Sequence, residues 1–291
     1  MNTAAASQQS FTDNPIEVRK FEPDISQVSE YYFDNDPFKT HFMNAMSITF
    51  PEGERYFLRS VLAYREEISD PKLHEEIQQF CAQEAQHSLV HMKLNESPKR
   101  FGYPMDQIEA FVGKMLRART AAGKKSAAWR RYNLAVTVCL EHFTAVLANQ
   151  VLKKPELMFD GLDPAIRSLY QWHAVEEIEH RAVAFDVYKA TGGSGLVLRL
   201  VMLTTSLMFL FGSLRITYIL LRKRGHTKRL STWKSGFSYL FLPSQGMLFR
   251  VLPDWLTFFL PGFHPSKYHC DLDTAAVLQE LSEYLRPAEN V

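Results

Sequence analysis

The chain has 291 residues, of which 46% are hydrophobic, and its 33 basic and 32 acidic side chains leave a formal net charge of +1. The hydrophobic content excludes a largely disordered chain, and the near-neutral balance excludes a nucleic-acid-binding protein that is basic throughout. The three cysteines, Cys81, Cys139 and Cys270, are odd in number and form no Cys-x-x-Cys pair. A disulfide framework or a thiolate zinc site is therefore not expected.

The first 22 residues are polar and lack the apolar core of a signal peptide, which predicts a flexible lead-in and a cytoplasmic protein. Asp36-Pro37 has the form of a helix N-cap followed by proline, and predicts a short helix that ends near Ser47. Thr49 and Glu52 have the spacing of a capping box and predict a helix over 50–68.

Four long helices are expected in the first two thirds of the chain, at 50–68, 71–94, 127–152 and 163–190. The second and third are separated by an amphipathic segment at 104–120 and a loop at 121–126. This order predicts an all-α protein with a ferritin-like four-helix bundle and a long connection. The expected divisions are a lead-in at 1–22, the bundle at 23–193, and an apolar helical extension at 194–291 that closes with a helix at 273–285.

Two of these helices carry the same motif, Glu-x-x-His, as Glu84 to His87 and as Glu177 to His180. Residues three apart lie on one face of a helix, so a carboxylate and an imidazole can point to the same place. One such pair occurs by chance on many helix surfaces. Two copies on separate long helices indicate a shared metal site.

A di-metal bundle of this kind needs one further glutamate from each of the other two helices. Glu54 lies beside the apolar residues of 50–68, whereas Glu52 has the expected capping role. Glu141 lies in an apolar run at 132–148, where an unpaired carboxylate is costly unless it is protonated, hydrogen-bonded or bound to metal. Both residues are therefore candidate ligands.

The candidate ligands are four carboxylates and two imidazoles, which suit two iron ions best and leave manganese or zinc as alternatives. Glu84 and Glu177 are expected to bridge the two metals, with one histidine on each. Glu54 and Glu141 are expected to be terminal ligands. The full set of candidate ligands is Glu54, Glu84, His87, Glu141, Glu177 and His180. One turn away on the same faces, His173 and His91 are candidates for an extra ligand or for hydrogen-bonding support.

The order Glu, Glu-x-x-His, Glu, Glu-x-x-His resembles that of ferritin-like di-iron carboxylate proteins. More narrowly, segments 50–57, 83–87 and 172–188 resemble a bacterial family described as predicted metal-dependent hydrolases, and the resemblance extends from about 31 to 260. It implies an enzyme that depends on bound metal and hydrolyses its substrate.

The C-terminal third has a different character, because the stretch 200–214 has no charged residue and aromatic residues accumulate after it. Nine Lys or Arg side chains and one acid, Asp254, lie within 195–265. Three interpretations of this segment stay open: a surface that docks on anionic lipid at the inner membrane, a membrane span over 196–221, or a lid on an apolar substrate pocket. Nucleic acid is not an expected partner, and a homodimer stays open.

Three functions fit the sequence. The first is an O₂-dependent oxidase or oxygenase acting on a hydrophobic, lipid-like substrate, which would need an electron donor. The second is metal-dependent hydrolysis at a two-metal site, as the family description says. The third is a non-enzymatic iron-binding bundle. The ligand set favours the first, and the family resemblance favours the second.

Overall fold

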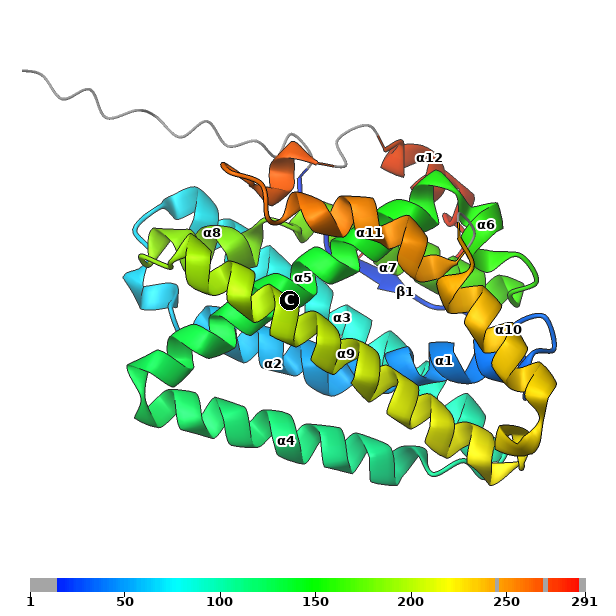
Figure 1. Cartoon of the computed structure of the whole chain (residues 1–291). Helices are drawn as coiled ribbons and strands as arrows, with labels where there is room; N and C mark the ends of the chain where they lie inside the picture. The colour runs from blue at the N-terminus through cyan, green and yellow to red at the C-terminus, as the bar shows by residue number, and fades with distance from the viewer. Residues whose placement is uncertain (1–14, 244–245, 269–271, 288–291) are drawn as a thin grey trace, which may run out of the picture.

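The computed structural model describes residues 15–243, 246–268 and 272–287, and over these ranges the protein is all-α with one two-stranded sheet (Figure 1). The first helices are α1 (Pro37–Ser47), α2 (Phe50–Leu62), α3 (Pro71–Arg100), α4 (Met105–Lys125) and α5 (Ala127–Lys153). They are followed by α6 (Pro155–Phe159), α7 (Pro164–His180), α8 (Val183–Ala190), α9 (Gly195–Lys223), α10 (Leu230–Phe241), α11 (Met247–Thr257) and α12 (Thr274–Glu280). Short 3₁₀ turns lie at Arg65–Glu67, His226–Lys228 and Pro265–Lys267.

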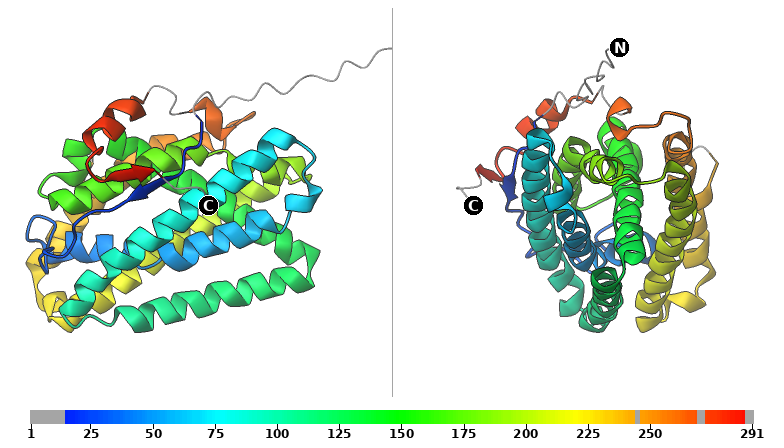
Figure 2. Two further views of the ribbon diagram at one scale, coloured as in Figure 1. Left: turned by 180° about the vertical axis from the view of Figure 1, so that it is seen from behind. Right: turned by 90° about the vertical axis from the view of Figure 1, so that its left-hand side faces the viewer.

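Four helices enclose the centre of the molecule. Helix α3 packs against α2 and α7, and α5 packs against α7 and α2, which closes a ring. Helix α4 lies outside this ring against α5 and α2, while α9 covers α1 and α5. In the end-on view of Figure 2, α9 to α11 lie on one side of the molecule and α3 on the other.

Asp-Pro pairs begin three of the helices, as expected. The carboxylates of Asp36, Asp70 and Asp163 each accept hydrogen bonds from backbone N–H groups in the first helical turn, and proline occupies the next position. These side chains satisfy N–H groups that have no partner within the helix. The predicted starts of α1, α3 and α7 are therefore confirmed.

The expected capping box at Thr49 is wrong. Thr49 has helical backbone angles, and its hydroxyl donates to the carbonyl of Met46 instead of capping α2. Glu52 forms salt bridges with Arg55 and Arg117 instead. Helix α2 also ends at Leu62 and is followed by a 3₁₀ turn, six residues before the predicted end at Ile68.

The predicted loop at 121–126 is helical, because α4 continues to Lys125. Gly123 lets α5 approach closely, since a Cβ at this position would lie 2.7 Å from Nδ2 of Asn133. That amide donates to the carbonyl of Arg119 at 2.9 Å. The turn between α4 and α5 is thus reduced to Ser126, which caps α5.

The helix expected over 163–190 is interrupted directly after His180. The guanidinium of Arg181 is buried and donates to the carbonyls of Ile178 and Pro265. A carbonyl occupied in this way is a poorer acceptor for the helical N–H four residues later, so α7 ends at His180 and α8 begins at Val183.

Residues 15–22 are not a flexible lead-in. Strand β1 (Arg19–Phe21) pairs antiparallel with β2 (Leu285–Pro287), and Phe21 stacks on Trp172 with ring centroids 5.0 Å apart. Residues 1–14 of the predicted lead-in lie outside the described residues. The helix expected over 273–285 is shorter than predicted, since α12 ends at Glu280 and β2 follows.

Candidate metal centre

The six predicted ligands are all buried in the ring of helices, with relative exposures of 0 to 4%. Helix α2 contributes Glu54, and α5 contributes Glu141. Helices α3 and α7 each contribute a carboxylate and an imidazole from one Glu-x-x-His motif. The structure therefore brings together residues that lie up to 126 positions apart in the sequence.

One half of the cluster surrounds the imidazole of His180. Its Nε2 atom lies 3.2 Å from Oε1 of Glu84, 3.3 Å from Oε2 of Glu141 and 3.4 Å from Oε2 of Glu177. Three carboxylates around one imidazole nitrogen form a compact set of hard donors, which is suited to a divalent transition metal.

The other half of the cluster surrounds His87. Glu54, Glu84 and His87 each offer a donor atom within 4.8 Å of the other two, and His87 Nδ1 lies 3.8 Å from Oε1 of Glu177. Glu84 and Glu177 are thus within reach of both histidines, whereas Glu54 and Glu141 lie toward opposite ends. This placement fits the expected bridging role of Glu84 and Glu177, which stays a prediction.

The cluster leaves several buried polar atoms without a hydrogen-bond partner in the described part of the chain. They are Oε1 of Glu54, Oε2 of Glu84, Oε1 of Glu141 and Nδ1 of His87, while Nε2 of His180 has only the carboxylate contacts at 3.2–3.4 Å given above. Burying unsatisfied polar atoms costs about 1–3 kcal/mol for each group. The atoms without partners are those that face the centre of the cluster, so the donor set fits a bound metal.

The buried carboxylates have strongly shifted pKa values. Burial raises the pKa of Glu54, Glu84 and Glu141 above the usual range of a glutamate. Burial also opposes ionisation of Glu177, but the imidazoles of His180 and His173 lower its pKa well below that range. Since metal ligands must be ionised, we expect metal binding to displace protons from this cluster.

A second layer of side chains holds the two imidazoles in place. Nε2 of His87 lies 3.1 Å from Oε2 of Glu176, and Oε1 of the same carboxylate accepts a hydrogen bond from the Trp172 indole at 3.0 Å. Nδ1 of His180 lies 2.8 Å from Oε1 of Gln83. When these nitrogens donate, the opposite nitrogen of each ring faces the centre as a lone-pair donor.

Arg19 of β1 completes this layer. Its guanidinium pairs with Glu179 at 2.8 Å and with Glu176 at 3.4 Å, and Glu179 accepts from Gln83 at 2.8 Å. The sequence analysis did not single out Arg19, Gln83 or Glu176 as supporting residues. A signal was present, because Gln83 and Glu176 are polar residues on the ligand-bearing turns of α3 and α7.

We expect Glu176→Gln to weaken metal binding by about 10–100-fold, because the amide loses the charge and one of the two acceptor atoms that orient His87 and Trp172. Competition between the protein and a coloured chelator measures this change. The matched control is Glu75→Gln at an exposed position of α3, which should bind metal as the wild type does. If Glu176→Gln bound metal with the affinity of the wild type, Glu176 would not be a positioning residue for His87.

His173 and His91 lie beside the cluster and belong to two further groups of possible ligands, one with Glu54 and one that joins His173 to His87 and Glu177. Nε2 of His173 lies 2.8 Å from Oε1 of Glu177, and its Nδ1 lies 2.8 Å from Nε2 of His91. Nδ1 of His91 lies 3.0 Å from the Ser47 hydroxyl, which donates to Asn95. Both nitrogens of His173 are thus engaged in hydrogen bonds, and its role as an extra ligand or as hydrogen-bonding support stays a prediction.

Comparison with known proteins agrees with this site. A search of curated proteins and a search of solved structures each returned no match. A family model described as "Predicted metal-dependent hydrolase" matches residues 17–269, which include all six predicted ligands and Arg19. On this match over most of its length, the chain belongs to the family of predicted metal-dependent hydrolases.

Proposed function

We propose that the protein is a hydrolase that works with two divalent metal ions held by the six clustered ligands, on a substrate with an apolar chain. When bound, the two ions would supply Lewis-acid chemistry, polarising the bond to be cleaved and activating water at neutral pH. The observation that carries the proposal is the set of buried donor atoms without partners, which converge on one centre in a chain of this family.

An apolar cavity beside the centre supports the choice of substrate. Its volume is about 60 Å³, and its wall includes His173 and Glu177. Four methionines contribute to the rest of the wall: Met43, Met46, Met158 and Met247. Because methionine side chains adapt their shape easily, such a wall can yield to an alkyl or acyl chain longer than the cavity as it stands.

The residues around the cavity have separable tasks in this proposal. Thr144 donates a hydrogen bond to Glu177 and so fixes the carboxylate that faces the cavity. His173 lies between Glu177 and His91, and is placed to carry a proton away from the reacting group. The apolar wall excludes bulk water and holds the chain of the substrate.

Tyr170 offers a polar contact for the substrate. It lines the cavity, it is buried, and its hydroxyl has no hydrogen-bond partner in the described part of the chain. We expect Tyr170→Phe to raise KM by about 2–10-fold, because one hydrogen bond to the substrate is lost. Metal content should not change, and Tyr132→Phe on α5, outside this cavity wall, is the control. An unchanged KM would exclude this contact.

Hydrolysis of 4-nitrophenyl esters with acyl chains of increasing length tests the proposed function. We expect activity that a chelator abolishes, that added metal restores, and that increases from acetyl to longer acyl groups. The rate should be equal under argon and in air. A metal-loaded protein that hydrolyses none of these esters, or that prefers acetyl, would contradict this choice of substrate.

The second candidate is O₂-dependent oxidation of the same class of apolar substrate. The donor set favours it, because four carboxylates and two imidazoles beside an apolar cavity suit iron, which would supply O₂ chemistry. Iron-dependent O₂ uptake with a lipid-like substrate and a reductant, without ester cleavage, would select oxidation over hydrolysis.

A further inference from the structure

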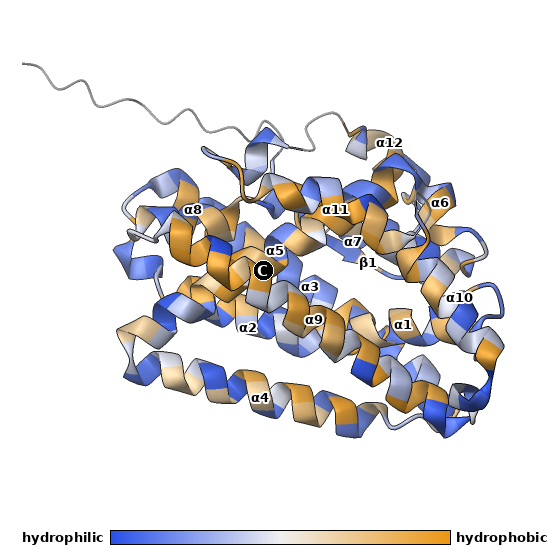
Figure 3. Cartoon of the chain, viewed as in Figure 1, coloured by the Kyte–Doolittle hydropathy of each residue, from blue (hydrophilic) through white to orange (hydrophobic). Residues whose placement is uncertain are grey.

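Large hydrophobic side chains are exposed mainly on one side of the protein. Seventeen of the 24 that are exposed in the described residues lie between 196 and 260, on α9, α10, α11 and the turns beside them. Figure 3 shows that hydrophobic residues predominate along α9 and are interspersed with polar ones along α10 and α11, and Figure 2 places the three helices on one side. The most exposed include Leu200, Phe211, Phe237 and Leu256, at 58, 65, 63 and 50%. We call the exposed side of α9 to α11 the apolar face.

Helix α9 has the hydropathy of a membrane span but not the surroundings of one. Two helices of the described chain are long and apolar enough to cross a bilayer, and they differ in burial: 78% of the apolar window of α5 is buried, against 22% for α9. One edge of α9, with Met202 and Leu220, packs on α1 and α5. Since α1 and α5 hold this edge, α9 fits a helix that lies in an interface.

Helix α11, like α9, packs one side on the protein and exposes apolar residues on the other. Val251 faces the interior, whereas Phe249, Leu252 and Leu256 are exposed at helical spacing. Helix α10 is fixed over α1 by Gly236, where a Cβ would lie 2.4 Å from the ring of Phe38. The apolar face is therefore part of the folded protein and is held rigidly in place.

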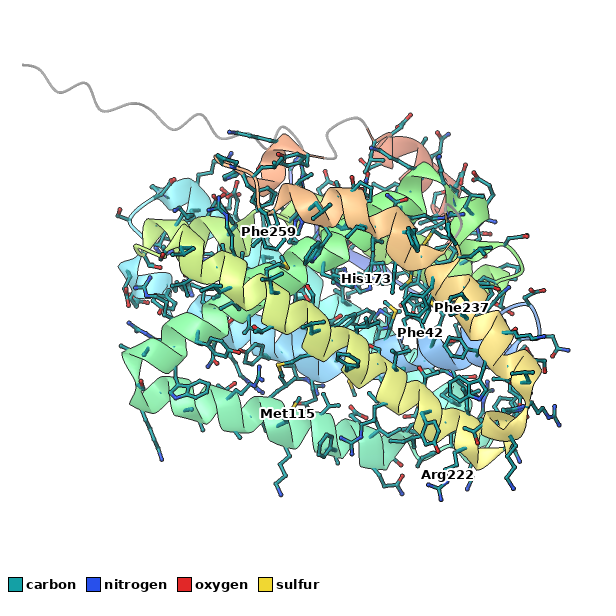
Figure 4. All side chains as sticks on the ribbon, in the orientation of Figure 1. Phe42, Met115, His173, Arg222, Phe237 and Phe259 are labelled. Carbon is teal, nitrogen blue, oxygen red and sulfur yellow. The ribbon has the colours of Figure 1, made fainter. Side chains whose placement is uncertain are left out.

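Charge identifies the partner of this face. Residues 195–265 carry nine Lys or Arg side chains and one acid, Asp254, which accepts hydrogen bonds from Asn149 and Gln150. Five of the cations lie within 222–229, where α9 turns into α10 (Figure 4 labels Arg222). In the described part of the chain, only Arg224 of these five lies within 4.0 Å of a carboxylate.

Exposed apolar side chains beside unpaired cations complement a bilayer that contains anionic lipid. A second copy of the chain is a poorer partner, because a two-fold contact would pair this face with itself, and its nine cations would meet a surface that carries one acid. We propose that the apolar face docks on an anionic membrane surface, with α9 to α11 lying in the plane of the headgroups and the cations of 222–229 at the rim.

The cavity at the metal centre meets these same helices. Tyr239 of α10 and Met247 of α11 belong to its wall, together with His173, which is labelled in Figure 4. Docking would thus bring the wall of the cavity close to the apolar interior of the bilayer. The docking proposal does not depend on the reaction, and it stands if the metal centre performs another chemistry.

Co-sedimentation of the full-length protein with vesicles tests the proposal. We expect binding to vesicles of phosphatidylglycerol mixed with phosphatidylcholine, much weaker binding to phosphatidylcholine alone, and a loss of binding as salt increases. Leu200→Glu and Leu256→Glu should each weaken binding at least tenfold. Leu89→Glu on α3, a residue with a similar exposure of 51%, should have no effect. Thermal melting checks that each variant is folded.

A charge reversal separates the contribution of the cations. Lys223→Glu should weaken binding by about fivefold or more, because each cation near the surface contributes about 1 kcal/mol, whereas Lys93→Glu on α3 should leave binding unchanged. Equal binding to neutral vesicles, or no binding to either kind, would overturn the proposal. So would a dimer seen by light scattering that Leu200→Glu and Leu256→Glu convert to a monomer.

Discussion

Alanine at Glu84 or Glu177 should abolish binding of both metal ions. Each carboxylate lies within reach of both histidines, so its removal takes a ligand from both ions and leaves a cavity in the donor set. Loss of supporting residues costs about 10–100-fold in metal affinity, and a shared ligand should cost more than that. Metal analysis after gel filtration measures the retained ions, and the ester assay should show no activity.

Glu75→Ala is the control for this prediction, since Glu75 lies on α3 like Glu84 but is exposed. It should retain the metal content and activity of the wild type. If Glu84→Ala or Glu177→Ala kept both ions, the bridging assignment would be wrong. If either variant kept one ion, the carboxylate would belong to a single metal.

The metal-free protein should become more stable when Glu141 is replaced by methionine. Both oxygens of Glu141 are buried, Oε1 has no hydrogen-bond partner in the described chain, and burial raises the pKa of this carboxyl well above its usual range. A methionine of similar length removes a penalty of about 1–3 kcal/mol. Thermal melting with a chelator should show a higher Tm, by about 2–4 °C for each kcal/mol.

Addition of metal should reverse the order of the two proteins. Metal binding stabilises the wild type by mass action, while Glu141→Met lacks a ligand and should respond weakly. Glu75→Met at an exposed position should leave both the metal-free Tm and the response to metal unchanged. A metal-free Glu141→Met that melts below the wild type would show that Glu141 supports the fold rather than the site.

The elements that the sequence predicted well are those set by local chemistry. Asp36, Asp70 and Asp163 begin helices because an aspartate followed by proline caps a helix wherever it stands. The elements that were predicted wrongly depend on contacts between residues that are distant in the sequence. Pairing of residues 19–21 with 285–287 joins opposite ends of the chain, and the break after His180 depends partly on a bond from Arg181 to Pro265.

The six candidate ligands could be found from the sequence because helical spacing relates the residues of each motif and an isolated carboxylate in an apolar run is unusual. All six converge in the structure, together with His173 and His91. Their supporting layer was harder to find, because Arg19 reaches Glu176 and Glu179 across more than 150 residues of chain. Glu176 could not be recognised as a supporting residue from the sequence, because it does not belong to a repeated motif as Glu84 and Glu177 do.

Crystals of the metal-loaded protein, measured at the absorption edge of the metal found by elemental analysis, test the central claim most directly. We predict two anomalous peaks inside the ring of helices, one beside Nδ1 of His87 and one beside Nε2 of His180, with Glu84 and Glu177 between them. A single ion, ions bound outside this cluster, or metal-loaded crystals with no peak there would contradict a two-metal centre.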